Sequence, residues 1–273
     1  MRVMTWNLWW RFGEYERRAP AIAAVLQAEA PDILCVQEVW SDASHDQADD
    51  LATILDGNVA RTTPVMFDGF SFGNAIVSRW PIEVLTEERL PNADGQPGHR
   101  RLLVAAVETP WGRWPAAVTH LDHRFDASAT RRQQVERVLE VIDAHRGNGD
   151  VDLPMILGGD LNAVPDSDEI RTLTGRRPGV AGIVMSDVWE QVGQGAGHTW
   201  RRNNPHVAIS AWPDRRIDYL GVSWPRPKPL GNPVRAWLAA TSPVEIEGTP
   251  IWPSDHAAVV AELTTPEDAA ASG

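Results

Sequence analysis

The residues best suited to chemistry lie at the end of one short apolar run, Met155-Ile156-Leu157, which resembles a buried strand. After two glycines the run ends in a polar pair, Asp160 and Asn162. The two residues are two positions apart, so an extended backbone would direct both side chains to the same face. A carboxylate and an amide in this position are costly to desolvate unless a partner or a metal ion binds them. An Asx-type turn that closes the strand is the alternative explanation for this pair alone.

Other polar residues also follow or interrupt apolar runs along the chain. They are Asn7, Glu38, His120, Asp218, Asp255 and His256. Each one alone has a plain structural explanation, as a turn cap or as a hydrogen-bonded core histidine. Eight such placements in one chain are harder to explain separately. They predict a single site if the strand ends meet at one edge.

The donor set of this predicted site is rich in oxygen. It holds four carboxylates, two imidazoles and two amides, and no cysteine. Such ligands suit a hard cation, Mg²⁺ or Mn²⁺, rather than zinc. The amides and imidazoles can donate to phosphate oxygens, and Asp218 can orient His256 and stabilise its protonated form. The set therefore predicts attack of water on a metal-bound phosphate ester.

The elements that must position these residues form a strand-rich pattern. Strands are predicted over 2–10, 32–39, 62–66, 72–78, 81–89, 101–108, 113–120, 217–222 and 257–263, besides the strand before Asp160. Helices are predicted over 16–29, 42–55, 128–144, 169–173 and near 187–190, and loops over 91–100, 193–215 and 225–233. Most connections are typical of hairpins, which favours two mixed sheets stacked face to face with helices outside. Residues 1–264 are expected to form one domain and 265–273 a disordered tail.

Composition narrows the function classes. The 273 residues carry 37 acidic against 25 basic side chains, a net charge of −12, which argues against non-specific coating of DNA. A nuclease remains open because bound divalent ions invert the local field. Cys35 is the single cysteine and lies in an apolar run, which predicts a small buried thiol and favours the cytoplasm. The chain has no apolar run of membrane-spanning length and no signal-peptide pattern, so we expect no stable membrane insertion. We also expect a monomer.

Seven short motifs, taken in order, resemble the endonuclease/exonuclease/phosphatase superfamily of metal-dependent phosphoesterases. They are Thr5-Trp6-Asn7-Leu8, Gln37-Glu38-Val39, Gly73-Asn74-Ala75-Ile76, Thr119-His120-Leu121, Gly159-Asp160-Leu161-Asn162, Arg216-Ile217-Asp218-Tyr219 and Ser254-Asp255-His256. The resemblance extends from Arg2 to Leu263. It implies a DNase I-like α/β fold, a four-layer sandwich of two stacked mixed β-sheets flanked by helices.

The resemblance also implies which residues hold the metal. Glu38 would bind the catalytic Mg²⁺ or Mn²⁺, with Asp255 contributing directly or through water. Asn7 would position Glu38 and the phosphate. The motifs leave open whether one metal ion or two operate.

The remaining members of the set would act on the water and the phosphate. By the same resemblance, Asp160 would orient or deprotonate the attacking water. Asn162 and His120 would stabilise charge on the phosphoryl oxygens. His256, paired with Asp218, would bind the phosphate or act as a base.

The substrate is the least determined feature. The segments 6–10 and 37–40 are more similar to the sphingomyelinase-type and general phosphodiesterase branch than to exonuclease III-like repair enzymes. Arg101, Asn74, Trp9 and Trp40 are the predicted substrate-binding residues, with core packing as the alternative for the tryptophans. We expect a phosphodiester substrate, which is a small molecule, a lipid head group or a nucleic acid. A DNA or RNA nuclease, a phosphomonoesterase on inositol phosphates or nucleotides, and an inactive binding module are the alternatives.

Overall fold

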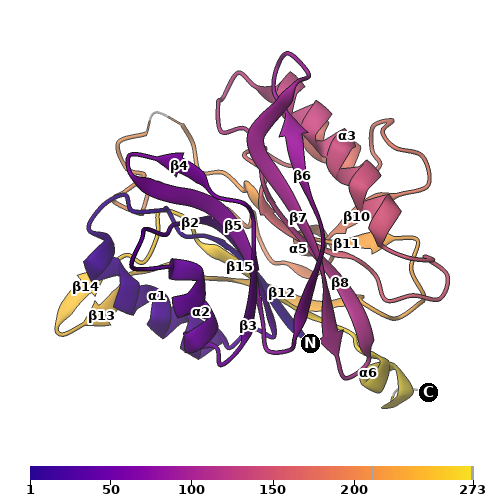
Figure 1. The fold of residues 1–273 in the computed structure, drawn as a ribbon, viewed down its shortest axis with the longest axis horizontal. Coiled ribbons are helices and arrows are strands. Elements are labelled where there is room, and N and C mark those ends of the chain that lie inside the picture. The colour runs from indigo at the N-terminus through magenta and orange to yellow at the C-terminus, as the bar shows by residue number, and fades with distance from the viewer. Residues whose placement is uncertain (211, 272–273) are drawn as a thin grey trace.

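The chain folds into two mixed sheets that face each other, with helices on both outer faces (Figure 1). The computed structural model describes residues 1–210 and 212–271. The first sheet contains β1 (Arg2–Asn7), β2 (Ile33–Val39), β3 (Asn58–Arg61), β4 (Val65–Phe67), β5 (Phe70–Ser78), β12 (Pro233–Ala239) and β15 (Ala258–Leu263). The second contains β6 (Ile82–Pro91), β7 (Pro97–Thr109), β8 (Gly112–His120), β9 (Ile156–Asp160), β10 (Val184–Asp187) and β11 (Asp218–Trp224). A separate hairpin joins β13 (Val244–Ile246) to β14 (Thr249–Ile251).

The helices complete the four layers that the sequence predicted. They are α1 (Tyr15–Glu29), α2 (Gln47–Ile54), α3 (Ser128–His145), α4 (Asp168–Leu173), α5 (Val188–Val192) and α6 (Pro266–Ala271). Figure 1 shows α1 and α2 on the outer face of the first sheet and α3 on the outer face of the second. In the described part of the chain, no helix has the length and apolar character that crossing a membrane requires.

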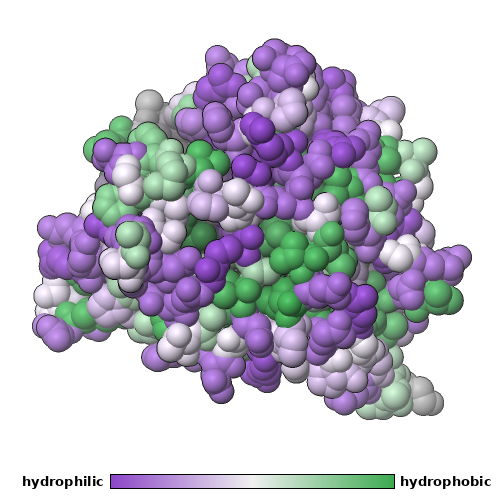
Figure 2. Space-filling view, viewed as in Figure 1, coloured by the Kyte–Doolittle hydropathy of each residue, from purple (hydrophilic) through white to green (hydrophobic). Residues whose placement is uncertain are grey.

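Side chains alternate across the central strands, so each strand contributes to two cores. In β1, Val3 joins the core between the sheets and Met4 the core beneath α1 and α2. In β9, Ile156 faces the first sheet and Leu157 joins the core that contains residues of α3 and α4. Figure 2 shows a largely polar face whose apolar residues gather in the middle, where the two sheets meet in Figure 1.

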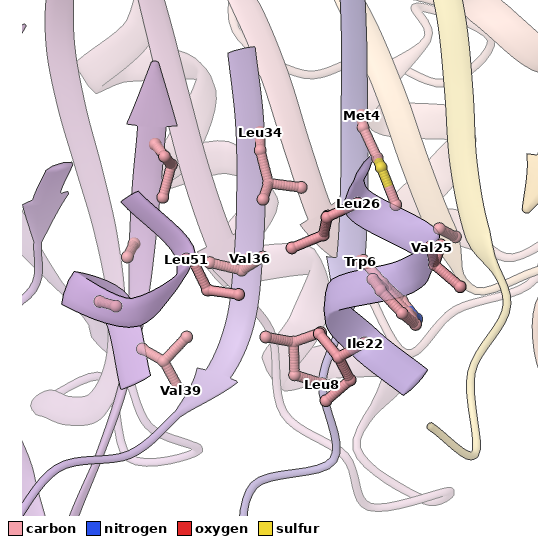
Figure 3. Close-up of a cluster of buried hydrophobic side chains, with 14 of the residues drawn as sticks. Met4, Trp6, Leu8, Ile22, Val25, Leu26, Leu34, Val36, Val39 and Leu51 are labelled. Carbon is pink, nitrogen blue, oxygen red and sulfur yellow. The ribbon is translucent and has the colours of Figure 1, made fainter. Parts of the chain in front are cut away.

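Helix α1 packs on the first sheet through residues three and four apart. Ile22 and Leu26 point from the helix toward the sheet, Ile22 beside Leu8 and Leu26 near Met4 (Figure 3). From α2, Leu51 lies next to Val36 of β2. These contacts pack α1 and α2 on β1 and β2, and the two strands end at or next to predicted site residues, Asn7 and Glu38.

Strand direction determines where the predicted site forms. β1 and β2 are parallel, as are β8 and β9, so their carboxyl ends lie at one edge of the sandwich. β11 and β15 run antiparallel to these strands and therefore begin at the same edge. In register, Asp160 lies between His120 of β8 and Asp218 of β11. The amino terminus of β1 and the carboxyl terminus of β15 lie at the opposite edge.

Several predicted boundaries were wrong. β7 already begins at Pro97, which pairs with Pro91, so the loop predicted over 91–100 is shorter. α2 begins at Gln47 rather than at 42, because the Asp46 side chain accepts from the amide of Ala48 and caps the helix there. Strands β3, β10 and β12 to β14 were not predicted.

The tail was also predicted incorrectly. Pro266–Ala271 forms α6 where the sequence predicted disorder over 265–273, of which 272–273 lie outside the described residues. The Thr265 hydroxyl donates to the Asp268 carboxylate at 2.8 Å and accepts from the Asp268 amide at 3.3 Å, which fixes the first turn.

Candidate active site

Asp160, the last residue of β9, lies at the centre of the site. Its Oδ2 accepts a hydrogen bond from Asn7 Nδ2 at 2.9 Å and lies 3.4 Å from His120 Nε2 and 3.8 Å from His256 Nε2. Its Oδ1 accepts from the Asn162 amide at 2.9 Å and closes an Asx-type turn. The turn and the functional cluster are therefore compatible, because each uses a different oxygen of one carboxylate.

Asn162 lies beside this centre in a backbone conformation that differs from the prediction. β9 ends at Asp160, and Asn162 has a φ of 52°. An extended backbone that directs both side chains to one face was therefore wrong. Asparagine tolerates this left-handed region better than most residues. The Asn162 side chain donates from Nδ2 to the carbonyl of Leu121, at 3.2 Å, and so connects the segments that follow β8 and β9.

Glu38 reaches the site through an irregularity of β2. The register with β5 shifts between Gln37 and Val39, and Glu38 adopts a φ of 59°. Such a bulge redirects one side chain of an otherwise regular strand. Glu38 Oε1 accepts from Asn7 Nδ2 at 3.1 Å and lies 4.0 Å from His120 Nδ1. Asn7 therefore donates to the carboxylates of both Glu38 and Asp160, one from each sheet.

The second oxygen of Glu38 is buried and, among the described residues, has no hydrogen-bond partner. Burial, and then the nearby Asp255 carboxylate, raise the pKa of Glu38 to about 7, although the bond from Asn7 opposes the shift. An unpaired, desolvated carboxylate oxygen is unfavourable by itself. The position therefore suits a cation.

His256 and Asp218 form a buried pair. His256 Nδ1 lies 2.8 Å from Asp218 Oδ2, and the Thr199 hydroxyl accepts from the Asp218 amide at 3.2 Å. Burial alone lowers the pKa of His256, but the carboxylates of Asp218 and Asp255 outweigh it and leave this pKa well above its ordinary value. His256 is therefore a cation, and its Nε2 is directed toward Asp160 and Asp255 at 3.8 and 3.9 Å.

Asp255 is held against β1 by its neighbour. The Ser254 hydroxyl donates to the carbonyl of Asn7 at 2.7 Å and contacts Asp255 Oδ1 at 3.4 Å. Burial raises the pKa of Asp255, while His256 and a hydrogen bond from the Trp200 side chain oppose the rise. Asp255 and Glu38 are thus two desolvated carboxylates whose charges repel each other.

The donor set fits a divalent cation. Asp160, Asp218 and His256 each offer an atom within 4.8 Å of the other two. His256 binds Asp218 through Nδ1, and the nearby carboxylates raise its pKa, which favours a role as a hydrogen-bond donor at Nε2. The unpaired oxygen of Glu38 and the nearby Asp255 carboxylate fit a hard cation better.

Of the two adjacent arginines, Arg101, the predicted substrate-binding residue, pairs with a carboxylate, whereas the charge of Arg100 interacts with the predicted site. Arg101 forms an ion pair with Glu87 at 2.7 Å. Successive side chains of β7 point to opposite faces, and Arg100 is the one whose charge interacts with Glu38 and Asp160. The Nη1 atom of Arg100 is buried and has no hydrogen-bond partner within the described ranges. The sequence shows the two adjacent arginines, but it does not show which of them faces the site.

Two of the other predicted substrate-binding residues, Trp40 and Asn74, are buried. Trp40 is 4% exposed and packs between Tyr15 and Phe70, so it cannot stack on a ligand in this structure, and the core-packing alternative holds. Asn74 is buried and donates to the carbonyl of Arg101 at 3.3 Å. Trp9 is partly exposed beside the site, with the His206 ring 4.4 Å away and the Arg18 guanidinium 4.9 Å from its own ring.

Arg18 is a supporting residue that the sequence analysis missed. It lies in α1, is buried, and donates to the carbonyls of Leu8 at 3.0 Å and Pro253 at 2.7 Å. It thereby connects the segment after Asn7 to the segment before Asp255. Burial lowers the pKa of Arg18 to about 10, against the opposing charge of Asp255. An arginine within a helix pattern gives no sequence signal for this role.

The fold and the site together define a class of protein. A four-layer α/β sandwich whose strand ends gather carboxylates, imidazoles and amides is the arrangement of a phosphoester hydrolase. Residues 4–256 match the sequence model of the Endonuclease/Exonuclease/phosphatase family, and the chain belongs to this family. The family generally uses a divalent metal ion.

Individual relatives are more distant. Protein angel of Drosophila melanogaster is 26% identical over 177 residues, 60% of this chain and 48% of that protein, so the chain spans about half the length of this curated relative. An endonuclease/exonuclease/phosphatase from Beutenbergia cavernae is 27% identical, with a TM-score of 0.69 over 96% of this chain and 70% of that one.

Two further solved structures, at 20% identity and a TM-score of 0.71, support the fold alone. One is D. rerio TDP2 complexed with a single strand DNA product, matched over 97% of this chain and 99% of that chain. The other is the mannosyl-6-phosphatase of Bacteroides thetaiotaomicron, matched over 97% of this chain and 100% of that chain.

Proposed function

We propose that this chain is a Mg²⁺- or Mn²⁺-dependent hydrolase that cleaves phosphodiester bonds by in-line attack of water. The observation that carries the proposal is the convergence on Asp160 Oδ2. One carboxylate oxygen accepts from Asn7 and faces two histidines within 3.8 Å. Donors and a base so arranged suit a phosphoryl group that gains charge as water adds.

Glu38 and Asp255 are the proposed holders of the cation, with Asn7 fixing the orientation of Glu38. A hard divalent ion bound there supplies neutralisation of charge on a phosphoryl oxygen. The proposal agrees with the raised pKa of Glu38 and with its unpaired oxygen. The hydrogen bond from Asn7 leaves that second oxygen available.

Asp160 is the proposed base that orients the water and accepts its proton. His120 is a neutral donor, because burial and then the charge of Arg100 lower its pKa well below the ordinary value. Asn162 is the second proposed donor to a phosphoryl oxygen. His256, held cationic by Asp218, is the proposed anchor of the phosphate.

Arg100 is the proposed second phosphate anchor, in place of Arg101. Its Nη2 lies 3.1 Å from His123 Nδ1, and its Nη1 lacks a partner in the described part of the chain. A guanidinium with a free, buried donor next to carboxylates is suited to an anionic ligand. In this proposal, two cationic groups, His256 and Arg100, bind the phosphate.

The test is hydrolysis of bis-p-nitrophenyl phosphate with Mn²⁺, comparing the wild type with Asp160→Ala and His256→Ala. We expect the wild type to be active and each variant to lose at least about a hundredfold in kcat/KM. Asp94→Ala, in the exposed loop after β6, is the matched control and should keep full activity. Equal activity of wild type, Asp160→Ala and His256→Ala would remove the proposal. Plasmid nicking and digestion of single strands test the nuclease alternative.

We further propose that residues 1–264 act as one catalytic domain, as a monomer in the cytoplasm. The continuous sheets support the first part, since β1 and β15 pair although they come from the two ends of the chain. A single buried thiol is typical of a reducing compartment such as the cytoplasm, and burial raises the pKa of Cys35 to about 12. Sedimentation velocity tests the monomer.

A further inference from the structure

Two exposed aromatic rings stack on each other beside the proposed active site. The ring centroids of Phe125 and Trp212 are 4.3 Å apart, and the planes differ by 11°. Both side chains are 46% exposed, although large apolar residues are usually covered. Phe125 lies five positions after His120, and Trp212 lies six positions before Asp218. The pair therefore joins two loops that both connect to the site.

Arg215 connects the aromatic pair to the catalytic centre. Its guanidinium carbon lies 5.0 Å from the centre of the Phe125 ring and 6.0 Å from that of Trp212. Its Nη2 donates to the carbonyl of Asn162 at 3.4 Å. Asn162 in turn donates to Asp160 Oδ1. One arginine and one asparagine thus separate the rings from the proposed base.

Hydrogen bonds hold the loop that carries Phe125 and the residues that flank the loop of Trp212. The loop that carries Phe125 is held by Arg131, whose Nη1 donates to the carbonyls of Asp122 at 3.1 Å and Arg124 at 2.6 Å. Arg131 is itself buried in an ion pair with Glu169 at 2.7 Å. On the other side, the backbone of Arg215 exchanges hydrogen bonds of 2.9 and 3.0 Å with Trp200. A rigid aromatic surface binds a ligand at a lower entropic cost than a mobile one.

We infer that Phe125 and Trp212 form a stacking platform for a planar ring of the substrate, so that the enzyme acts on nucleoside-bearing phosphodiesters. The inference rests on the proposed hydrolase function and specifies its substrate class. Aromatic side chains stack on nucleobases with little sequence preference, because every base has a π-face. A cationic lipid head group fits less well, because Arg215 already places a positive charge against both rings.

The experiment uses two esters with the same leaving group, thymidine 5′-(p-nitrophenyl phosphate) and methyl p-nitrophenyl phosphate. They differ only in the nucleoside, so a platform affects the first and not the second. For Phe125→Ala and for Trp212→Ala we expect KM for the thymidine ester to rise about tenfold, with kcat within about twofold of the wild type. Both constants for the methyl ester should stay unchanged.

Three controls make the result specific. Phe125→Tyr keeps the ring and should restore the KM of the wild type. Trp224→Ala removes another exposed tryptophan, 40% exposed at the far end of β11, and should change neither ester. An unchanged KM for the thymidine ester in both alanine variants, or an equal loss on both esters, overturns the inference.

A binding assay separates this inference from the hydrolase proposal. A fluorescent thymidine oligonucleotide and an abasic oligonucleotide of equal length are titrated with Asp160→Ala protein, with and without Phe125→Ala. We expect the thymidine strand to bind about tenfold more weakly without the ring, and the abasic strand to bind equally. If neither ester is hydrolysed by the wild type, the hydrolase proposal fails. In that case, the oligonucleotide titration alone tests the inference that Phe125 and Trp212 stack on a base.

Discussion

Asp218→Asn tests how the proposed phosphate anchor is held. The substitution keeps the size of the side chain and removes the charge 2.8 Å from His256 Nδ1. Burial alone lowers the pKa of His256, and Asp218 is the first of the carboxylates that outweigh it. Without that charge, we expect the pKa of His256 to fall and the imidazole to donate more weakly to a phosphoryl oxygen. Loss of one such preorganised charged donor costs about 3 kcal/mol in the transition state, or about a hundredfold in kcat/KM.

The assay is a double-mutant cycle on bis-p-nitrophenyl phosphate at saturating Mn²⁺. Asp218→Asn, His256→Gln and the double variant should lose similar amounts, because the two residues act as one unit and their losses do not add. Asp32→Asn removes a carboxylate at the opposite edge, paired with Arg79, and should stay within about twofold of the wild type. Losses that multiply in the double variant, or an Asp218→Asn variant as active as the wild type, would refute the reasoning.

Three other predictions concern the metal ion, the packing and the pH dependence of stability. EDTA should abolish the activity, and Mn²⁺ or Mg²⁺ should restore it. In calorimetry, Glu38→Gln should bind Mn²⁺ at least about tenfold more weakly than the wild type. Undiminished binding contradicts the assignment of Glu38 as a metal ligand. In Gly158→Ala, the added methyl carbon would lie 2.5 Å from Cys35 Cβ in the contact between the sheets, so urea unfolding should show a loss of about 1–3 kcal/mol that Cys35→Gly partly reverses. Equal stability of Gly158→Ala and wild type would show that this contact is not tight. A hydrogen bond from Arg235 lowers the pKa of Glu262 from 4.5 to about 2, so its contribution is present above pH 4.5 and is lost as the pH falls toward 2. Glu262→Gln should therefore cost about 0.5–1 kcal/mol of unfolding free energy at pH 7 and less at pH 3; a difference independent of pH speaks against this linkage.

The strand ends could be located from the sequence because buried strands leave a simple pattern. Residues such as Asn7 and Asp160 terminate continuous apolar runs, and a desolvated polar group at such a place needs a partner. That argument needs no knowledge of distances, so it could name eight candidate residues before their positions in space were known. It did not reveal the bulge that redirects Glu38, because a bulge changes the backbone without changing the run of residue types.

The direction in which a side chain points was harder to predict than the strand on which it lies. Arg100 and Arg101 are adjacent and chemically equal, and only the register of β7 decides which one points to Asp160. Trp40 follows Glu38 closely in sequence, yet it packs into the core beside Tyr15. Proximity along the chain therefore did not predict proximity to a ligand.

By itself, the sequence determined which side chains are available: oxygen donors without cysteine, paired histidines, and apolar runs that must be buried between sheets and helices. Only the tertiary structure decided how these groups act on one another. The charge on His256, the neutrality of His120 and the raised pKa of Glu38 follow from burial and from distances of a few ångströms between residues far apart in the chain. Desolvation and Coulomb interactions depend on position in space, which residue order does not specify. The same holds for Phe125 and Trp212, whose stacking arises where two separate loops meet.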